Sequence, residues 1–389
     1  MLRVLTLATL FPDAARPTFG GFVERQTLGL AARDDVELEV VAPIGIPPWP
    51  LSRHPHYRRF ADVPEREVWK GIVVHRPRFR LIPKIGGSLT PATIAKTVRP
   101  LIATIRERFA FDIIDAEFFY PDGAAAMRLA GTFGVPYSVK ARGTDIHFWG
   151  KRRGSARQVL AAARNAGGLL AVSAALKNDM TALGMDAGSI AVHYTGIDRE
   201  RFHPVDRAAA KAALDIDGPL VVTVGALIER KGQALVIDAL SNVPGATAIF
   251  VGDGPDRAVL ENRARKLGLG ECVRMPGNLP HDEVARHVAA ADVMVLPSAS
   301  EGLANAWVEA LASGTPIVIS DAGGARELLD RPEAGAMVPR DPKAIADAIK
   351  AILADPPAQD AVRATVDRFS WEANSEALFD HLSAIVERH

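Results

Sequence analysis

The chain has 389 residues, of which 48% are hydrophobic and 24% are charged. This length and composition exclude wholesale disorder and indicate two domains, each large enough to bury its own core. The single cysteine, Cys272, excludes a disulfide framework and a cysteine-based zinc site. The sequence shows neither an apolar run long enough to span a membrane nor a signal-peptide pattern, so a cytoplasmic location is expected.

The formal net charge is zero, but the two halves of the chain carry opposite charge. Residues 1–195 contain 26 lysines and arginines against 17 acidic residues, and the remainder contains 20 against 29. The excess concentrates between Arg53 and Lys84, where nine basic and three acidic residues occur together with Trp69, and Trp49 lies just before. This stretch is either a solvated loop face or a surface for an anionic acceptor or an anionic membrane.

Short β-branched runs alternate with Ala- and Leu-rich stretches along the chain, which is typical of βαβ units and parallel sheets. In the first half we expect strands over residues 4–8, 38–42, 72–75, 113–116, 137–140 and 169–171, with helices over residues 22–32, 92–109 and 123–133. In the second half we expect strands over residues 220–225, 247–252, 272–275, 293–297, 317–320 and 336–338, with a helix over residues 233–240.

A break at residues 196–204 separates the two series of elements. It predicts one open α/β domain over residues 1–195 and a second over residues 196–370, followed by a C-terminal helix over residues 371–389 that has no strand of its own. In open α/β sheets, ligands bind beyond the carboxyl ends of the strands. We therefore expect the functional residues in the loops that follow the strands.

In the first half, the segment after the strand at residues 137–140 contains Arg142, Asp145 and His147. Arg142 either binds a ligand phosphate or pairs with Asp145. His147 is either a packed loop residue or a base. In the second half, Arg230 and Lys231 open the helix that follows the strand at residues 220–225. Two cations in such a turn suit a diphosphate, although lysines beside a helix start are also common on surfaces.

The segment at residues 293–316 is the richest in functional signals. An apolar strand runs into a loop that contains Glu301, and a helix with Glu309 in its early turns follows. Two carboxylates that flank a helix N-terminus suit a sugar nucleotide, because carboxylates accept hydrogen bonds from vicinal hydroxyls and the N-terminus favours anions. The alternative is that one glutamate is only a partner of the helix dipole. The backbone N–H groups expected at this N-terminus are those of Gly302, Leu303, Ala304 and Asn305.

The spacing Glu301-x7-Glu309 within EGLANAWVEALASGTPIV resembles the E-x7-E signature of retaining, family 4 GT-B glycosyltransferases. Further segments fall in that family's order: residues 172–177, 196–204, 224–225 with 231–232, 251–255, 277, and 323–327. The resemblance implies two Rossmann-like domains that face each other across a cleft, with the acceptor in the first and the nucleotide-sugar donor in the second. It also implies a C-terminal helix that crosses back to the first domain.

Roles for single residues follow from the same resemblance. Lys231 matches the lysine that binds the diphosphate, and the family's arginine after the strand glycine is replaced here by Ala226, which leaves Arg230 as its substitute. Arg142 stands where the family's H-G-x-D segment has histidine. The remaining matches place Glu301 at the sugar hydroxyls, Glu309 at the ribose hydroxyls, Gly21 in the glycine loop near the donor phosphate, Met275 near the base, and Asp145 in the H-G-x-D segment.

We therefore expect a retaining hexosyltransferase that moves a sugar from a nucleotide-diphosphate donor to a lipid-linked or saccharide acceptor in polysaccharide or glycoconjugate biosynthesis. We expect no metal, no cofactor and no nucleic-acid partner. We do expect peripheral attachment to the cytoplasmic face of an anionic membrane. The alternatives are a nucleotide-sugar epimerase or hydrolase, for which Asp115 and Glu117 are the clustered acids, and a two-lobed sugar-binding protein. A dehydrogenase would need G-x-G-x-x-G after the first strand, where Leu10-Phe11-Pro12 stands instead.

Overall fold

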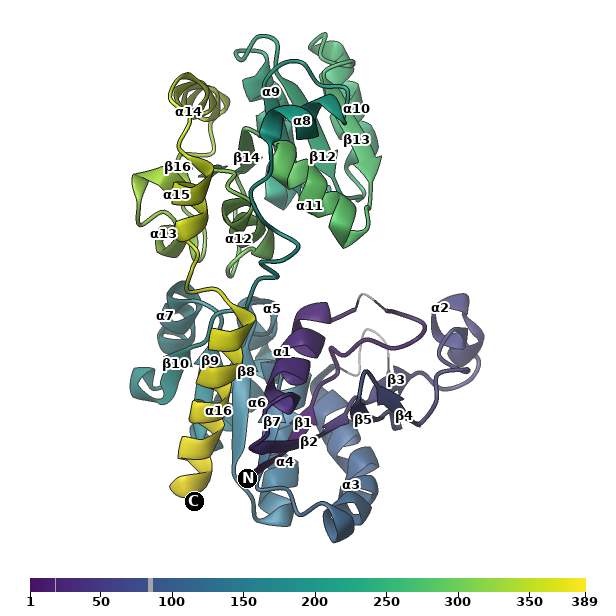
Figure 1. Cartoon of the computed structure of the whole chain (residues 1–389). Coiled ribbons are helices and arrows are strands. Elements are labelled where there is room, and N and C mark those ends of the chain that lie inside the picture. The colour runs from purple at the N-terminus through teal and green to yellow at the C-terminus, as the bar shows by residue number, and fades with distance from the viewer. Residues whose placement is uncertain (18, 83–86) are drawn as a thin grey trace. The chain divides into compact units, whose positions relative to one another are not determined.

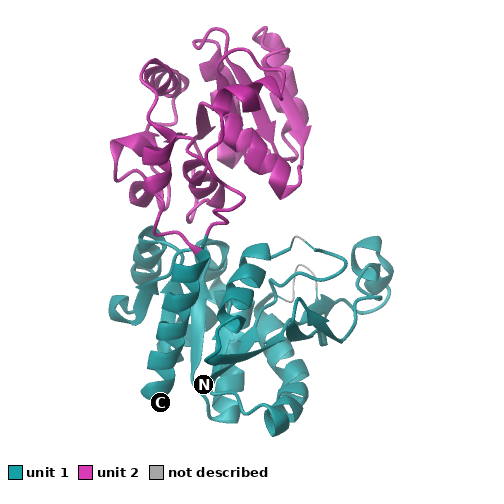
Figure 2. Cartoon of the chain, viewed as in Figure 1, with its two compact units in different colours: residues 1–196, 371–389 teal, residues 197–370 magenta. Residues whose placement is uncertain are grey.

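In the computed structural model, which describes residues 1–17, 19–82 and 87–389, the chain forms two compact units. Unit 1 comprises residues 1–196 and 371–389, and unit 2 comprises residues 197–370 (Figure 2). Figure 1 labels their elements. The basic stretch singled out in the sequence ends at Lys84, which lies outside the described residues.

The strands of unit 1 are β1 (Leu2–Leu7), β2 (Val36–Val41), β3 (Ile44–Ile46), β4 (Arg66–Trp69), β5 (Ile72–His75), β6 (Arg78–Arg80), β7 (Ile113–Ala116), β8 (Tyr137–Ala141), β9 (Gly168–Ala171) and β10 (Ile190–Val192). Its helices are α1 (Gly21–Ala31), α2 (Pro55–Arg58), α3 (Thr90–Arg108), α4 (Ala124–Phe133), α5 (Thr144–His147), α6 (Arg153–Asn165), α7 (Ala174–Ala182) and α16 (Trp371–Glu387).

The main sheet of unit 1 has the strand order β10-β9-β8-β7-β1-β2-β5-β4, and its described pairs are parallel except for β4 with β5. Strand β1 pairs with β2 on one side and with β7 on the other, so the order reverses at β1. Strands β7 (IIDA) and β8 (YSVKA) are buried along their whole length, so their polar residues Asp115, Ser138 and Lys140 lie in the interior of the unit.

Helix α16 belongs to unit 1, although it follows the last residue of unit 2 in sequence. Its side chains Leu378, Leu382 and Ile385 are buried in one apolar cluster with residues of β1, α1, β7 and β9. The helix lies against α1 so closely that a Cβ on Gly29 would stand 2.3 Å from the Ser375 Oγ. This glycine is therefore required by the approach of the two helices.

The strands of unit 2 are β11 (Leu220–Val224), β12 (Thr247–Val251), β13 (Val273–Gly277), β14 (Val293–Leu296), β15 (Ile317–Ile319) and β16 (Gly335–Met337). Its helices are α8 (Arg207–Ala212), α9 (Gln233–Leu240), α10 (Arg257–Lys266), α11 (His281–Ala290), α12 (Asn305–Ala312), α13 (Ala325–Leu328), α14 (Pro342–Ala354) and α15 (Gln359–Ala364). The described strands pair in parallel in the order β13-β12-β11-β14-β15-β16, so the order reverses at β11.

The predicted fold class is confirmed, since each unit is a Rossmann-like α/β domain with a mostly parallel sheet. The sequence analysis missed β3, β4, β6 and β10. Strands β4 (REVW) and β6 (RFR) consist largely of charged residues, and β4 alternates between exposed and half-buried positions at the edge of its sheet. Edge strands of this kind carry little apolar periodicity and therefore escape a search for apolar runs.

Candidate functional site

The loops that follow β11 and β14 bring three predicted residues together in unit 2. The Lys231 Nζ donates a hydrogen bond to the Glu301 Oε1 at 2.5 Å, and the Arg230 Nη1 lies 3.5 Å from the same oxygen. The side chains of Lys231 and Glu301 are 14% and 10% exposed, whereas that of Arg230 is 46% exposed. The alternative of an ordinary surface lysine is therefore wrong for Lys231, which forms a sheltered ion pair.

Two glycines allow these loops to approach each other. Gly232 has a φ of 78°, and a Cβ there would stand 2.6 Å from the carbonyl oxygen of Pro297 at the end of β14. Gly225 follows β11 with a φ of 152°, and a Cβ there would lie 3.7 Å from the Lys231 Cε. A side chain at position 232 would collide with the Pro297 carbonyl, whereas at position 225 a Cβ has room and only the backbone conformation would be strained.

The N-terminus of α12 lies directly after this ion pair in sequence. Its N-cap residue, Ala304, has no side-chain acceptor, so the first N–H groups of the helix are left for a ligand or solvent. The preceding loop is held by backbone contacts, because the Gly324 N–H donates to the Gly302 carbonyl at 2.6 Å. A Cβ on Gly323 would stand 2.3 Å from the carbonyl oxygens of both Glu301 and Gly302. The Gly-Gly pair thus serves close packing beneath the loop.

Glu309 lies one turn inside α12, and its carboxyl group has an unusual proton affinity. Burial raises its pKa to about 7, and the positive charge of Arg201 counteracts this only in part. No residue in the described part of the chain hydrogen-bonds its carboxyl oxygens. A carboxyl group without a protein partner suits a ligand hydroxyl. The hydroxyl can donate a hydrogen bond to the ionised carboxylate or accept one from the protonated acid.

Two further predicted positions in unit 2 have structural surroundings. The Met275 side chain packs against the apolar core of the unit, and its carbonyl accepts a hydrogen bond from the Arg257 Nη2 at 2.6 Å. Ala226, which replaces the family's arginine, has its carbonyl held by the buried Gln233 Nε2 at 2.9 Å. Sequence reasoning missed Gln233 because its only signal is a polar residue at a helix start.

In unit 1, the alternative that the Arg142 side chain pairs with Asp145 is wrong. The buried Arg142 guanidinium forms an ion pair with Glu117, donates from Nε to the Glu117 carbonyl at 2.9 Å, and lies 4.7 Å from the centre of the Phe22 ring. The Asp145 carboxylate instead accepts backbone N–H groups, including those of Gly143 at 2.8 Å and Arg142 at 3.1 Å. Asp145 therefore organises the loop after β8, and burial raises its pKa.

A buried polar network beside Arg142 was missed by sequence reasoning. The Lys140 Nζ donates to the Gln26 Oε1 and to the His193 Nδ1, and the His193 Nε2 donates to the carbonyl of Asn374 on α16 at 2.8 Å. Burial lowers the pKa of both Lys140 and His193 well below their usual values. The signal in the sequence was a lysine inside an otherwise apolar strand, but its partners are too distant along the chain to be identified by spacing.

The other sites proposed for unit 1 have simpler surroundings. His147 forms a pair with Asp179 at 2.8 Å, in which the histidine is 29% exposed. Gly21 opens α1 and has free space around a hypothetical Cβ, whereas Gly20, with a φ of 69°, would place a Cβ 2.3 Å from the Leu10 carbonyl oxygen. The close approach of backbone in this loop therefore requires Gly20 and leaves Gly21 open to a ligand.

The acids of the alternative hydrolase or epimerase are not accessible. Asp115 is 2% exposed and Glu117 is 1% exposed. Burial and the nearby Glu117 carboxylate raise the pKa of Asp115 well above its usual range. Since Glu117 is also paired with Arg142, neither carboxyl group is available to a substrate in unit 1.

The basic stretch of unit 1 is divided between interior and surface. Arg76 is fully buried and pairs with Glu67, and Lys70 pairs with Glu24 at 2.8 Å. Trp69 is half-buried, whereas Trp49 is 72% exposed. The arginines of this stretch that are exposed in the structure are Arg53, Arg58, Arg59, Arg66 and Arg80.

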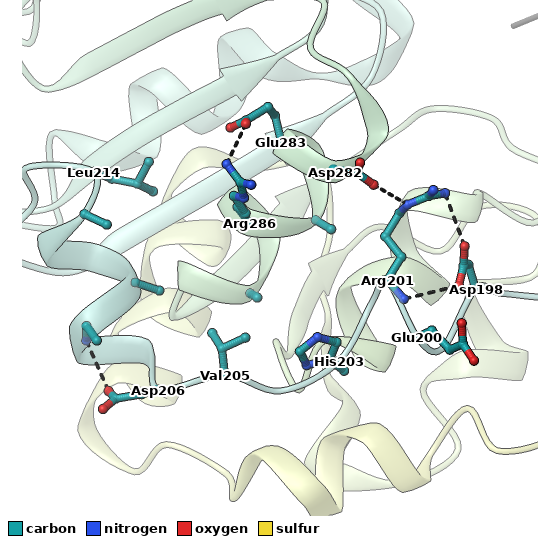
Figure 3. Close-up of a pocket in the computed structure, with 15 residues that line it drawn as sticks. Asp198, Glu200, Arg201, His203, Val205, Asp206, Leu214, Asp282, Glu283 and Arg286 are labelled. Carbon is teal, nitrogen blue, oxygen red and sulfur yellow. Dashed lines mark hydrogen bonds and ion pairs between the residues drawn. The ribbon is translucent and has the colours of Figure 1, made fainter.

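A cavity of 820 Å³ lies elsewhere in unit 2, between the segment that follows residue 197, α8 and α11 (Figure 3). Arg201 points between Asp198 and Asp282 and pairs with both, and Arg286 pairs with Glu283. Both arginines that line the cavity are thus paired with carboxylates that also line it, and none of the predicted site residues lines it.

Neither a metal cluster nor a membrane span is found in the part of the chain that the structure describes. Across residues 1–17, 19–82 and 87–389, no three His, Cys, Asp or Glu side chains are gathered as metal ligands. Over the same ranges, no helix has the length and apolar character that crossing a membrane requires.

Each of the two parts of the chain matches a known family model. Residues 24–201 match the family model of Glycosyltransferase Family 4, and residues 205–368 match that of glycosyl transferases group 1. The putative teichuronic acid biosynthesis glycosyltransferase TuaC of Bacillus subtilis is 28% identical over 90% of this chain and 88% of its own length. A GDP-mannose-dependent phosphatidylinositol monomannoside mannosyltransferase of Mycolicibacterium smegmatis is 33% identical over 48% of this chain and 54% of its own length.

Solved structures share the fold along the whole chain. Sucrose-phosphate synthase from Thermosynechococcus elongatus has a TM-score of 0.81 at 21% identity and is covered completely, as is this chain. Anabaena HepE, solved in complex with UDP, has a TM-score of 0.76 at 20% identity, with 99% of this chain and 100% of HepE covered. At these identities the likeness establishes the fold.

Proposed function

We propose that this chain, which belongs to the GT-B glycosyltransferases that join a Family 4 domain to a group 1 domain, transfers a hexosyl group from a nucleotide-diphosphate sugar with retention of the anomeric configuration. The acceptor is a lipid-linked or saccharide hydroxyl in glycoconjugate or polysaccharide biosynthesis. The observation that carries the proposal is the sheltered Lys231–Glu301 pair beside the uncapped N-terminus of α12. A cation, an anion-binding helix start and a carboxylate together suit a sugar diphosphate.

In this mechanism, the donor diphosphate is held by Lys231 and by the N–H groups of Gly302–Asn305, and Arg230 adds charge from the solvent side. Glu301 then accepts hydrogen bonds from the hexose hydroxyls. The bond between the anomeric carbon and the phosphate oxygen breaks as the acceptor oxygen attacks the same face. The acceptor proton passes to the departing phosphate oxygen, so that charge is balanced without a protein base.

The remaining predicted residues support this reaction from two sides. We assign Glu309 to the ribose hydroxyls and Met275 to the surroundings of the base. In unit 1, Gly21 gives the phosphate room to approach α1. Glu117 neutralises Arg142, so we assign Arg142 the role of a hydrogen-bond donor to the acceptor rather than of a free charge. Asp145 holds that loop in place through its backbone N–H contacts.

A screen of nucleotide-diphosphate sugars tests the proposal. We expect one donor to raise the melting temperature by an amount that increases with the logarithm of its concentration relative to Kd, because ligands that bind only the native state stabilise it. With that donor, NMR of the product should show the anomeric configuration of the donor, and activity should persist in excess EDTA. An inverted product contradicts the retaining mechanism. Loss of activity in EDTA that Mg²⁺ or Mn²⁺ restores contradicts metal independence.

We further propose that unit 1 attaches to an anionic membrane. Arg53, Arg58 and Arg59 are exposed in the same short segment as Trp49, and each such charge contributes about 1 kcal/mol near an anionic surface. Screening limits this attraction to a distance of about 8 Å at physiological salt. Interfacial tryptophan adds apolar contact.

Vesicle co-sedimentation checks the attachment. We expect binding to vesicles that contain anionic lipid but not to zwitterionic vesicles, and a decrease of binding as salt is raised. Replacing Arg58 and Arg59 together by glutamate should abolish the binding. The matched control is Arg128→Glu, which reverses one exposed charge on α4. Equal binding to both vesicle types, or none to either, would show that these arginines serve another purpose.

A further inference from the structure

Unit 1 contains a cavity of 610 Å³ beyond the carboxyl ends of β7 and β8. Tyr120 follows β7, and Phe148 and Trp149 follow β8, so both strands deliver aromatic side chains to it. Further apolar lining comes from Tyr57, Leu81, Ile82 and Pro121. Because β7 neighbours β1, where the strand order reverses, the cavity lies in the region of the sheet where open α/β domains bind ligands.

The aromatic wall of this cavity is fixed by its surroundings. The rings of Tyr120 and Trp149 lie 4.9 Å apart at an angle of 31°, and Phe148 meets Trp149 edge-on at 5.0 Å. The Ser155 Oγ on α6 donates to the Trp149 carbonyl at 2.6 Å, and the Tyr120 hydroxyl donates to the Gly87 carbonyl. The wall is therefore formed before any ligand arrives.

Part of this apolar surface faces water. Phe148 is 46% exposed and Ile82 is 40% exposed. Large apolar side chains are costly to leave in contact with water, and a group of them around a cavity marks a binding site more often than a defect. The natural occupant therefore has an apolar part.

The charge of the residues that line the cavity indicates that the occupant also has an anionic part. Arg152 lies 4.8 Å from the Phe148 ring centre and 5.6 Å from that of Trp149, and it makes no ion pair with any described residue. Among the described residues that line the cavity, none is an aspartate or a glutamate, and none is an asparagine or a glutamine. Carboxylates and amides are the usual partners of sugar hydroxyls. The lining thus fits an apolar anion better than a soluble saccharide.

We propose that this cavity binds the phosphate and the adjoining apolar carbons of a lipid phosphate, with Arg152 at the phosphate and the Tyr120–Phe148–Trp149 wall against the chain. The inference rests on the proposed glycosyl transfer and narrows its acceptor to the lipid-linked class. The phosphate would lie at the N–H edge of the Arg152 guanidinium, beside the aromatic rings, because a cation stacked on aromatic rings keeps that edge free for an anion.

Titration of the full chain with farnesyl phosphate, below its micelle concentration, tests the proposal through tryptophan fluorescence and calorimetry. We expect saturable binding that Phe148→Ala and Arg152→Glu each weaken roughly tenfold to a hundredfold. Phe148 and Arg152 are both exposed enough for the fold to tolerate these changes. The matched controls Val68→Ala and Arg99→Glu alter exposed residues of unit 1 outside the cavity and should leave the affinity unchanged.

Three outcomes would overturn the inference: no saturable binding, equal binding of farnesol without its phosphate, or equal losses in the control variants. Displacement of the probe by a soluble oligosaccharide would do the same in favour of a saccharide acceptor. Nucleotide-sugar binding by the same variants keeps this test separate from the proposed function. A chain that binds nucleotide sugars but not farnesyl phosphate loses only the lipid assignment. A chain that binds farnesyl phosphate but no nucleotide sugar loses the assignment of that lipid as an acceptor.

Discussion

Replacing Lys231 with alanine is expected to lower the rate of transfer roughly tenfold to a hundredfold, because the donor diphosphate loses a charge-assisted contact. The stabilisation lost with Lys231 should be larger in the transition state than in the bound donor, since charge builds up on the departing phosphate as the glycosidic bond breaks. Removal of the lysine also leaves Glu301 without its close partner, at 10% exposure, so a modest loss of stability accompanies the loss of activity.

The chain offers a matched control for this experiment. Lys211 of unit 2 forms a similar pair with Asp292 at 2.5 Å, in which both side chains are 18% exposed, but it lies outside the proposed donor site. Lys211→Ala should therefore cost stability while transfer by the folded protein stays at the wild-type rate. Wild-type kinetics in Lys231→Ala, measured with the true donor, would remove the diphosphate site from this loop.

Replacing Glu309 with glutamine should have opposite effects on activity and stability. The native pKa of Glu309 is about 7 against an ordinary value of 4.5, so between these pH values the native state holds a proton that the unfolded state has lost. The contribution of Glu309 to stability therefore falls as pH rises from 4.5 through 7. A shift of this size corresponds to about 3 kcal/mol once both states are ionised.

Glutamine carries no charge to bury, so above pH 7 the Glu309→Gln variant should unfold at higher urea concentration than the wild type. At pH 4 the two proteins should have similar stability. Asp122 of unit 1, whose pKa burial raises to about 7, adds the same kind of slope to both proteins and cancels in the difference. Transfer should fall most above pH 7, where Glu309 is ionised, because its carboxylate then offers an acceptor oxygen to each of two ribose hydroxyls and the glutamine amide offers only one. If the unfolding free energies of the two proteins depended on pH in the same way, Glu309 would not have a raised pKa in the native state.

The proximity of Lys231 and Glu301 in unit 2 could be predicted because its signals are local. Lys231 and Glu301 each follow an apolar strand, and strands β11 and β14 are neighbours whose carboxyl ends lie at one edge of the sheet. The pair between them, 70 positions apart in sequence, follows from that topology. The order of the strands, by contrast, is encoded in side-chain packing that no single segment of the sequence displays.

The contacts of Arg142 and Lys140 in unit 1 could not be predicted because they are long-range. Arg142 and Glu117 are 25 positions apart, and Lys140 reaches Gln26 across 114 positions. Neither spacing repeats a helical or strand period, so a carboxylate three residues away, Asp145, is the more obvious partner for Arg142 in the sequence. In the structure, however, the buried Asp145 carboxylate accepts hydrogen bonds from backbone N–H groups, and the Glu117 carboxylate neutralises the Arg142 guanidinium.

The membership of α16 in unit 1 also sets an order of events while the chain is being made. Residues 371–389 leave the ribosome after all of unit 2, so the apolar strip of Leu2, Leu30 and Leu170 that α16 covers stays open to water until those residues have been made. Unit 2 has all of its strands by residue 337 and can close its core first. Domains usually fold in the order of their synthesis, beginning at the N-terminus. Here unit 1, although most of it precedes unit 2 in sequence, is completed after unit 2.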